Sequence, residues 1–150
     1  MRPLNPSLDR RLTRYPSRKG VADAALAALQ PFSAKELMQH LRQSGQVASK
    51  ATVYRTLALM VENRLLKEST VPRGDLIYYP LAEHDGITWI CTECGSTRRQ
   101  PVSHLEGLLR QSAGQHGFHS SHLEVHVFTR CETSNCATLR VADLKRIWPG

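Results

Sequence analysis

The sequence has no long hydrophobic run and no apolar leader. A membrane-spanning helix needs roughly 18 consecutive apolar residues, but the longest candidate, residues 21–29, is mostly alanine and is broken by Asp23. Residues 1–7 contain two prolines and no apolar segment, which argues against a signal peptide. Hydrophobic residues make up 41% and charged residues 22% of the 150, a balance typical of folded chains. Secreted, membrane and fibrous classes are disfavoured, and we expect a cytoplasmic protein of about one to one and a half domains.

The first half of the chain is poor in acidic residues relative to basic ones. Residues 1–82 carry 13 Lys and Arg but 6 Asp and Glu, a net charge of +7, whereas residues 83–150 carry 7 of each. This asymmetry favours a basic module that binds a polyanion, joined to a neutral module with another role. A solvated basic face without a partner is the alternative. We place the domain limits at residues 1–82 and 83–150.

Cysteine is scarce, and all of it lies in the second half. The four residues form the motifs C-T-E-C and C-E-T-S-N-C, about 40 residues apart: Cys91, Cys94, Cys131 and Cys136. Structural disulfides are unexpected in a protein that is not secreted. Two short-spaced pairs with no spare cysteine predict one tetrahedral Zn²⁺ site with four thiolate ligands, with redox-active or free thiols as the alternative.

The pattern of the first half predicts a winged helix-turn-helix. A basic, proline-containing arm over residues 2–19 precedes a helical apolar stripe that Pro31 ends. A capping box at residues 33–36 begins a second helix, and Ser49 is the expected N-cap of a third. Two apolar runs then flank a Pro-Gly-Asp turn at residues 71–75, which is typical of a β-hairpin.

The third helix carries polar and basic side chains in its first turns, opposite its apolar stripe. These are Lys50, Thr52, Tyr54 and Arg55. Such a helix suits the DNA major groove, because phosphates favour a helix N-terminus and arginine can pair with guanine through two hydrogen bonds. Arg73 at the tip of the wing would contact the DNA backbone. An ordinary amphipathic surface helix is the alternative.

The second half predicts a small α/β domain, which makes the whole chain α+β. Strands over residues 87–90 and 97–102 flank the first cysteine pair, a capping box at residues 103–106 begins a helix that Gly117 ends, and residues 121–129 alternate as a strand. A unit this small has a thin hydrophobic core. Zinc binding and dimerisation would both stabilise it.

Several of these motifs together resemble the ferric uptake regulator (Fur) family. Residues 51–57 read Ala-Thr-Val-Tyr-Arg-Thr-Leu, residues 91–95 read Cys-Thr-Glu-Cys-Gly, and residues 115–118 read Gln-His-Gly-Phe ahead of the second cysteine pair. In this order, over roughly residues 10–136, the set is similar to that family and nearest to its zinc-uptake-regulator type.

The resemblance implies a dimeric transcriptional regulator, of the repressor kind, that binds a palindromic site in double-stranded DNA. It implies that Tyr54 and Arg55 face the bases and backbone, and that Arg11 in the basic arm reaches the minor groove or the phosphates. The second module would form the homodimer. A zinc-stabilised protein-interaction module without sequence-specific DNA binding is the alternative.

The resemblance also implies a second divalent-metal site. Its ligands would be His84, Asp85, Glu106 and His122, a set that suits Zn²⁺ or another first-row ion. Ordinary surface polar residues are the alternative reading of each.

Departures from the family pattern point to a degraded sensing site. Pro31 and Pro80 stand where ligands are usual, and Lys67 and Arg99, which are protonated at neutral pH, are poor metal ligands. We hypothesise that these two cations supply the positive charge of a missing ion, so that DNA binding is constitutive. Redox sensing through the four cysteines is a further alternative.

An enzyme is not predicted. Zinc deaminases combine H-x-E with P-C-x-x-C, but His84-Asp85-Gly86 lacks the glutamate and Ile90 stands where the proline would precede Cys91. Four thiolates would also close the zinc shell and leave no position for a substrate.

Overall fold

The computed structural model describes residues 6–71, 74–81, 86–120, 123–133, 135–136 and 144–150. Its contacts divide the chain into two units: the winged unit, residues 1–81 with 141–150, and the cysteine unit, residues 82–140. The α+β fold class is confirmed. The units differ from the predicted domain limits in one respect, because the last ten residues belong with the first unit. Among the described residues, no helix combines the length and apolar character that crossing a membrane requires.

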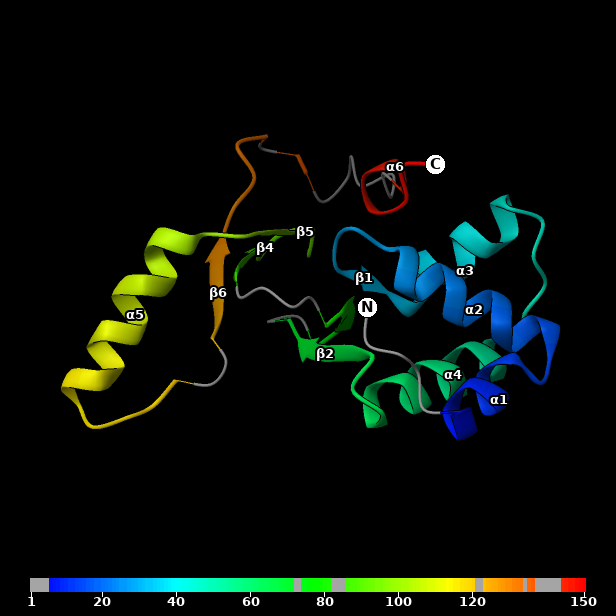
Figure 1. The fold of residues 1–150 in the computed structure, drawn as a ribbon. Coiled ribbons are helices and arrows are strands. Elements are labelled where there is room, and N and C mark those ends of the chain that lie inside the picture. Colours follow the sequence, from blue (N-terminus) through cyan, green and yellow to red (C-terminus); the bar gives the residue numbers. More distant parts are fainter. Residues whose placement is uncertain (1–5, 72–73, 82–85, 121–122, 134, 137–143) are drawn as a thin grey trace. The chain divides into compact units, whose positions relative to one another are not determined.

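The winged unit consists of helices packed on a three-stranded antiparallel sheet (Figure 1). Its elements are α1 (Pro6–Thr13), α2 (Pro16–Ala27), β1 (Phe32–Ser33), α3 (Ala34–Gln43), α4 (Lys50–Glu62), β2 (Leu66–Thr70), β3 (Leu76–Pro80) and α6 (Leu144–Ile147). The strand order is β1-β3-β2, and β2 and β3 form the predicted hairpin, with Glu68 opposite Tyr78. The predicted winged helix-turn-helix is therefore confirmed.

Side-chain caps fix where the two helices of the helix-turn-helix begin. At α3, the amide of Glu36 donates to Ser33 Oγ (3.2 Å), and the amide of Ser33 donates to Glu36 Oε2 (2.7 Å). At α4, the amide of Thr52 donates to Ser49 Oγ (3.1 Å). Each cap satisfies an N–H group that the helix itself cannot pair, worth about 1 kcal/mol. Both predicted starts are confirmed.

The basic arm is more helical than its prolines predict. Within residues 2–19, α1 forms with Pro6 as its first residue and α2 begins at Pro16. Proline is tolerated there because its missing N–H would be unpaired in any case. Leu8 and Leu12 of α1 are 6% and 2% exposed, so this helix packs on the core. The prolines therefore start helices instead of preventing them.

The C-terminal segment completes the core of the winged unit. Three of its side chains are at most 6% exposed: Leu144, Ile147 and Trp148. The Leu29 amide donates to the Ile147 carbonyl (2.9 Å), and Trp148 Nε1 donates to the Ala24 carbonyl (2.8 Å). The indole stacks on His40 of α3, with ring centres 4.3 Å apart and planes 8° apart. Burial lowers the pKa of His40, which keeps the stacked imidazole neutral near pH 7.

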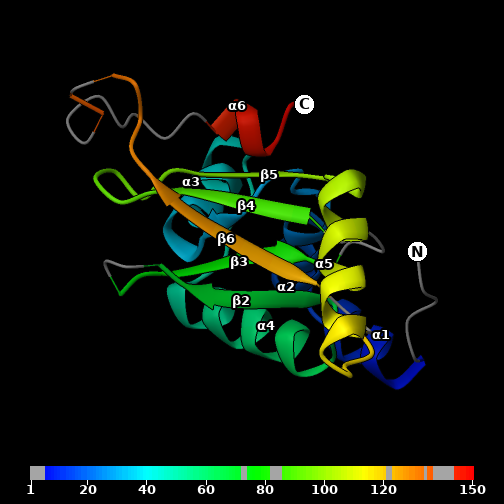
Figure 2. The same cartoon turned by 90° about the vertical axis from the view of Figure 1, so that its left-hand side faces the viewer.

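The cysteine unit has one small sheet and one long helix. Its elements are β4 (Gly86–Cys91), β5 (Thr97–Gln100), α5 (Ser103–Gln115) and β6 (Glu124–Thr129). The strand order is β5-β4-β6, with β4 antiparallel to β5 and parallel to β6 (Figure 2). The capping box predicted at residues 103–106 is wrong. Ser103 is already inside the helix, the N-cap position is Val102, and no side chain caps it.

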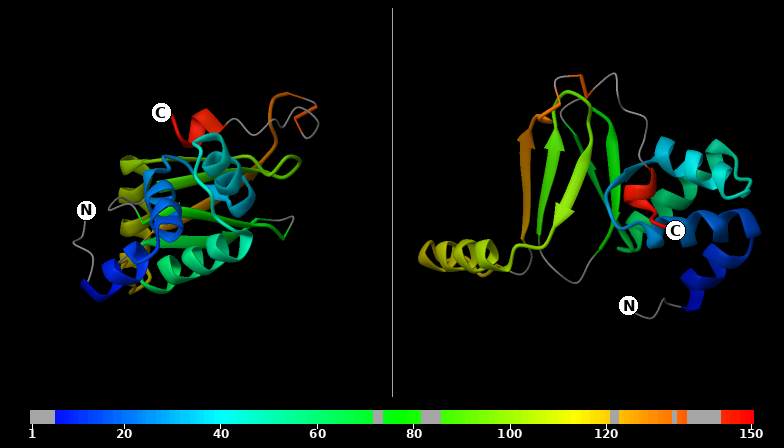
Figure 3. Two further views of the ribbon diagram at one scale, coloured as in Figure 1. Left: turned by 90° about the vertical axis from the view of Figure 1, so that its right-hand side faces the viewer. Right: turned by 90° about the horizontal axis from the view of Figure 1, so that it is seen from above.

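Helix α5 leaves its apolar side largely uncovered. It projects away from the sheet (Figure 3, right), and none of its residues is buried. Leu108 is 52% exposed, while Trp89 of β4 and Phe128 of β6 are 37% and 54% exposed. The expected thin core is thus present, and burial within one copy of this unit contributes little to its stability.

Replacing Trp148 with alanine should destabilise the winged unit by about 3–5 kcal/mol, because it removes a buried ring and leaves the Ala24 carbonyl unpaired. Hydrogen exchange of the α2 and α3 amides in the full chain measures this as faster opening. Trp148→Phe keeps the stacking and should lose less. Lys145→Ala, an exposed change on the same helix, is the control, and equal protection in Trp148→Ala and Lys145→Ala would show that α6 contributes nothing.

Candidate metal centre and DNA-binding surface

The four cysteine sulfurs converge on one point. The ligand atoms of Cys91, Cys94, Cys131 and Cys136 all lie within 4.8 Å of one another. Cys91 Sγ is 3.8 Å from Cys136 Sγ, and Cys94 Sγ is 3.7 Å from Cys131 Sγ. A disulfide would need about 2.05 Å. Four sulfurs at about 2.3 Å from a central Zn²⁺ lie about 3.8 Å apart at tetrahedral angles. The donor set and its spacing therefore fit a structural Zn²⁺.

Strand pairing brings the two motifs together across the sequence. Cys91 ends β4, and the parallel register places it opposite Thr129 at the end of β6, just before Cys131. The Thr92 amide donates to the Thr129 carbonyl (2.8 Å) and locks this end of the sheet. Gly95, at φ 70°, allows the tight turn between Cys91 and β5.

Without a metal, the thiols share protons unequally. Burial alone would raise the pKa of Cys91, but hydrogen bonds from the backbone of Cys94, Cys131 and Glu93 lower it to about 6. The pKa of Cys131 is raised to about 12, first by the side-chain hydrogen bond between Cys131 and Cys91 and then by burial. Burial is also the first cause of the raised pKa of Cys136. Zn²⁺ needs thiolates, so binding at pH 7 releases protons from this cluster.

Most of the predicted second-site ligands cannot be placed. His84, Asp85 and His122 lie outside the described residues. Glu106 is half-buried in the first turn of α5, against a small apolar gap lined by Leu109 and residues of β6. Within the described part of the chain, the cysteine cluster is the only group of three or more metal-ligating side chains. The second site stays a prediction.

Two other sets of charged residues bear on that prediction. Glu124 and His126 of β6 are hydrogen-bonded through Glu124 Oε1 and His126 Nε2, which lie 3.0 Å apart, and their side chains are 23% and 20% exposed. The alternation predicted for residues 121–129 puts both on one face of the strand, because residues two apart on a strand share a face, but it does not predict their pairing. Lys67 lies on β2 and Arg99 on β5, in different units. The hypothesis that they replace an ion stays untested.

Helix α4 buries one face and presents the other. Val53, Leu57 and Met60 are completely buried in the winged unit, whereas Tyr54 is 44% exposed and Arg55 is exposed. The exposed face carries the two residues predicted to read DNA bases.

The other two predicted residues of α4 frame this face. Lys50 is exposed, and its Nζ lies 5.9 Å from the centre of the Tyr54 ring, a cation–π contact. Thr52 is only half-exposed, and its hydroxyl lies 2.9 Å from Ser49 Oγ. Thr52 therefore belongs to the N-terminal cap, which limits its availability for a base contact.

A second group of cations surrounds the α1–α2 junction. Arg11 is exposed on α1, and its carbonyl accepts a hydrogen bond from Arg18 Nη1 (2.9 Å). The guanidinium groups of Arg14 and Arg18 lie 5.6 and 5.5 Å from the Tyr15 ring centre. This cluster concentrates positive charge on one helix junction. Arg73 lies outside the described residues.

Comparison with known proteins gives one consistent family. The sequence model described as "Ferric uptake regulator family" matches residues 11–128. The zinc uptake regulation protein of Mycobacterium tuberculosis is 30% identical over 124 residues, covering 82% of this chain and 94% of that protein. The ferric uptake regulation protein of Yersinia pestis is 28% identical over 114 residues, covering 76% and 77%.

Solved structures agree at the level of the fold. The crystal structure of the Vibrio cholerae ferric uptake regulator matches with a TM-score of 0.70 at 20% identity, and the match covers 82% of this chain and 95% of that one.

Loss of a single thiolate should release zinc and unfold the cysteine unit. Because no residue of α5 is fully buried, a bound metal would supply much of the stability of this unit, and structural zinc sites bind with about 10–16 kcal/mol. We expect Cys131→Ser to lose bound zinc in native mass spectrometry and to lose exchange protection in β4 and β6. The neighbouring Glu132→Gln, an exposed position, is the matched control. A serine variant that keeps both zinc and protection would exclude the four-thiolate site.

Proposed function

The chain belongs to the ferric uptake regulator family and is a DNA-binding transcriptional regulator; we propose that it acts as a zinc-containing homodimeric repressor on a palindromic operator. The single observation that carries this proposal is α4, a capped helix with one face in the core and Tyr54 and Arg55 exposed on the other. The protein-interaction module without DNA binding is not favoured by the family match.

The exposed face of α4 suits a major groove. Arg55 presents five N–H donors that can pair with the O6 and N7 atoms of guanine. Tyr54 offers an aromatic edge to the methyl group of thymine, and Lys50 beside it offers a charge to a phosphate. Base contacts by Tyr54 and Arg55 would specify the sequence, while Lys50, Thr52, Arg11 and Arg73 would position the duplex.

The cysteine unit supports the homodimer. Its exposed apolar side chains, Leu108 among them, form a surface that a second copy would cover. A two-fold dimer presents two α4 helices to two half-sites, which is why a palindrome is expected. A repressor of this kind works where the chromosome is, so we place it in the cytoplasm.

We assign the cysteine cluster a structural Zn²⁺ and a separate regulatory role to a second divalent ion at His84, Asp85, Glu106 and His122. One of the relatives is named a zinc uptake regulation protein, which supports zinc as the metal that this chain senses. No catalytic activity is proposed, because four thiolates fill a tetrahedral shell and leave zinc no position for a substrate.

An operator sequence can be identified by selecting the fragments of sheared genomic DNA that the protein binds. On the selected duplex, Arg55→Ala should weaken binding about ten- to a hundredfold and relax the preference at one base pair of each half-site. Arg64→Asn, at the far end of α4 with a φ of 58° that asparagine tolerates, removes the same charge as a control. If Arg55→Ala keeps both affinity and preference, α4 is not the reading helix.

The number of metal ions bound per chain distinguishes the proposed regulatory ion from the structural one. Native mass spectrometry with added Zn²⁺ should show two ions per chain in the parent protein and one in Glu106→Gln. Titration of the operator before and after adding back metal should show a rise in affinity of about tenfold or more. One ion per chain and unchanged affinity would instead support constitutive binding through Lys67 and Arg99.

A further inference from the structure

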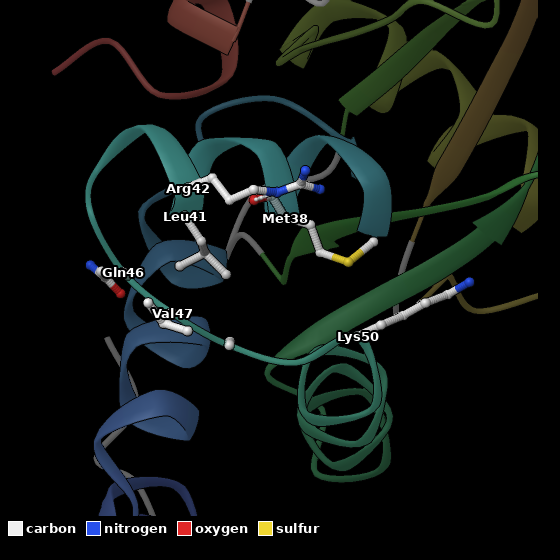
Figure 4. A pocket seen from close by; sticks show the side chains of 7 residues that line it. Met38, Leu41, Arg42, Gln46, Val47 and Lys50 are labelled. Carbon is white, nitrogen blue, oxygen red and sulfur yellow. Dashed lines mark hydrogen bonds between the residues drawn. The ribbon is translucent and has the colours of Figure 1, made fainter.

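The helix-turn-helix contains an open hollow of about 500 Å³ next to the first turn of α4. Figure 4 shows Met38 between the side chains of Arg42 and Lys50, with Leu41 and Val47 nearby. Its lining is largely apolar, with Gln46 as a neutral polar residue and with Arg42 and Lys50 supplying positive charge, and no acidic residue of the described chain lines it.

The hollow is built into the turn and is not the result of a frayed helix end. Gly45, at φ 73°, ends α3, and the Gln46 amide donates to the Leu41 carbonyl (2.9 Å). This turn leaves Val47 89% exposed. Ala48 follows with only a methyl group, so nothing from the turn fills the space above Leu41. Val47 lines the hollow together with Met38, Leu41 and Ala48, so its exposed side chain is part of a larger apolar surface next to two cations.

The rim is also ordered. Arg42 Nε donates to the Met38 carbonyl (3.4 Å), which fixes the guanidinium beside Met38. Lys50 lies over the Tyr54 ring, so the hollow is continuous with the face of α4 assigned above to DNA.

We infer that this hollow seats one stretch of the DNA sugar–phosphate backbone at the edge of the groove that α4 enters. Arg42 and Lys50 bind successive phosphates, and the deoxyribose between them packs on Val47 and Met38. Two cations flanking an apolar floor match the alternation of phosphate and sugar along a strand. Arg42, Val47 and Met38 are therefore positioning residues for the duplex.

An acidic peptide with apolar side chains would match the same chemistry. Continuity with the exposed turns of α4 favours DNA, because a bound peptide would share Lys50 and Tyr54 with the reading face. This inference rests on the proposed function and adds three residues to it.

The test separates charge from apolar packing in the full-length protein. Binding to mixed-sequence duplex DNA is measured between 50 and 200 mM salt for the parent protein and for Arg42→Gln, Val47→Thr and Val47→Ile. Losing one phosphate contact reduces the slope of log affinity against log salt concentration by about one unit. The ratio of the affinities at 50 and 200 mM salt should therefore shrink by roughly threefold in Arg42→Gln. Val47→Thr should weaken binding about threefold with the slope unchanged, and Val47→Ile should not weaken it.

Two controls make the outcome decisive. Arg64→Asn removes a charge from the residues just beyond the other end of α4 and should leave the slope unchanged. All three substituted positions are exposed, so the fold should be kept, and thermal unfolding verifies this. Parental affinity and slope in both Arg42→Gln and Val47→Thr would overturn the inference and leave the proposed function standing. A parent protein that binds no duplex at all would overturn both. The remaining outcome is that an acidic peptide binds the parent protein more tightly than it binds Val47→Thr, while DNA affinity is the same for both. That result would overturn the inference and assign the hollow to a protein partner.

Discussion

Four cysteine sulfurs, spaced like the corners of a tetrahedron, are the main stabilising feature of a unit whose only long helix has no fully buried residue. The parallel pairing of β4 and β6 delivers Cys91 and Cys131 to the same end of the sheet, while α5 buries none of its residues. The separation of 3.7–3.8 Å between sulfurs is too long for a disulfide and right for a shared Zn²⁺. A Zn²⁺ bound by these four sulfurs would stabilise the cysteine unit, and with it the proposed dimer that spaces two α4 helices.

The winged unit is stabilised in a different way. Helices α3 and α4 begin at side-chain caps, and the face of α4 that carries Tyr54 and Arg55 is held by Val53, Leu57 and Met60, which are buried on the opposite side. The proposed base contacts, the proposed phosphate contacts and the apolar floor of the hollow all lie in the N-terminal half of this helix or beside it. If the proposal holds, binding strength and sequence preference come from neighbouring residues of one rigid element.

Local chemistry made part of this predictable. The caps at Ser33 and Ser49 act over three residues, and the cysteine spacing is itself the ligand pattern, so both could be read from the sequence. Ser103 has the same local pattern but lies one residue inside α5, because the chain leaving β5 sets the start of that helix. The hollow beside Val47 was not predictable either, since it depends on how α3 and α4 meet in space.

The docking of α6 depends on a contact between residues far apart in the chain. Trp148 donates its hydrogen bond to a carbonyl 124 positions earlier, and no local motif records such a pairing. During synthesis, the ribosome must translate nearly the whole polypeptide before this indole can reach its place beside α2. The core of the winged unit, which begins at the first residues to be synthesised, is therefore completed only after the whole cysteine unit has been made.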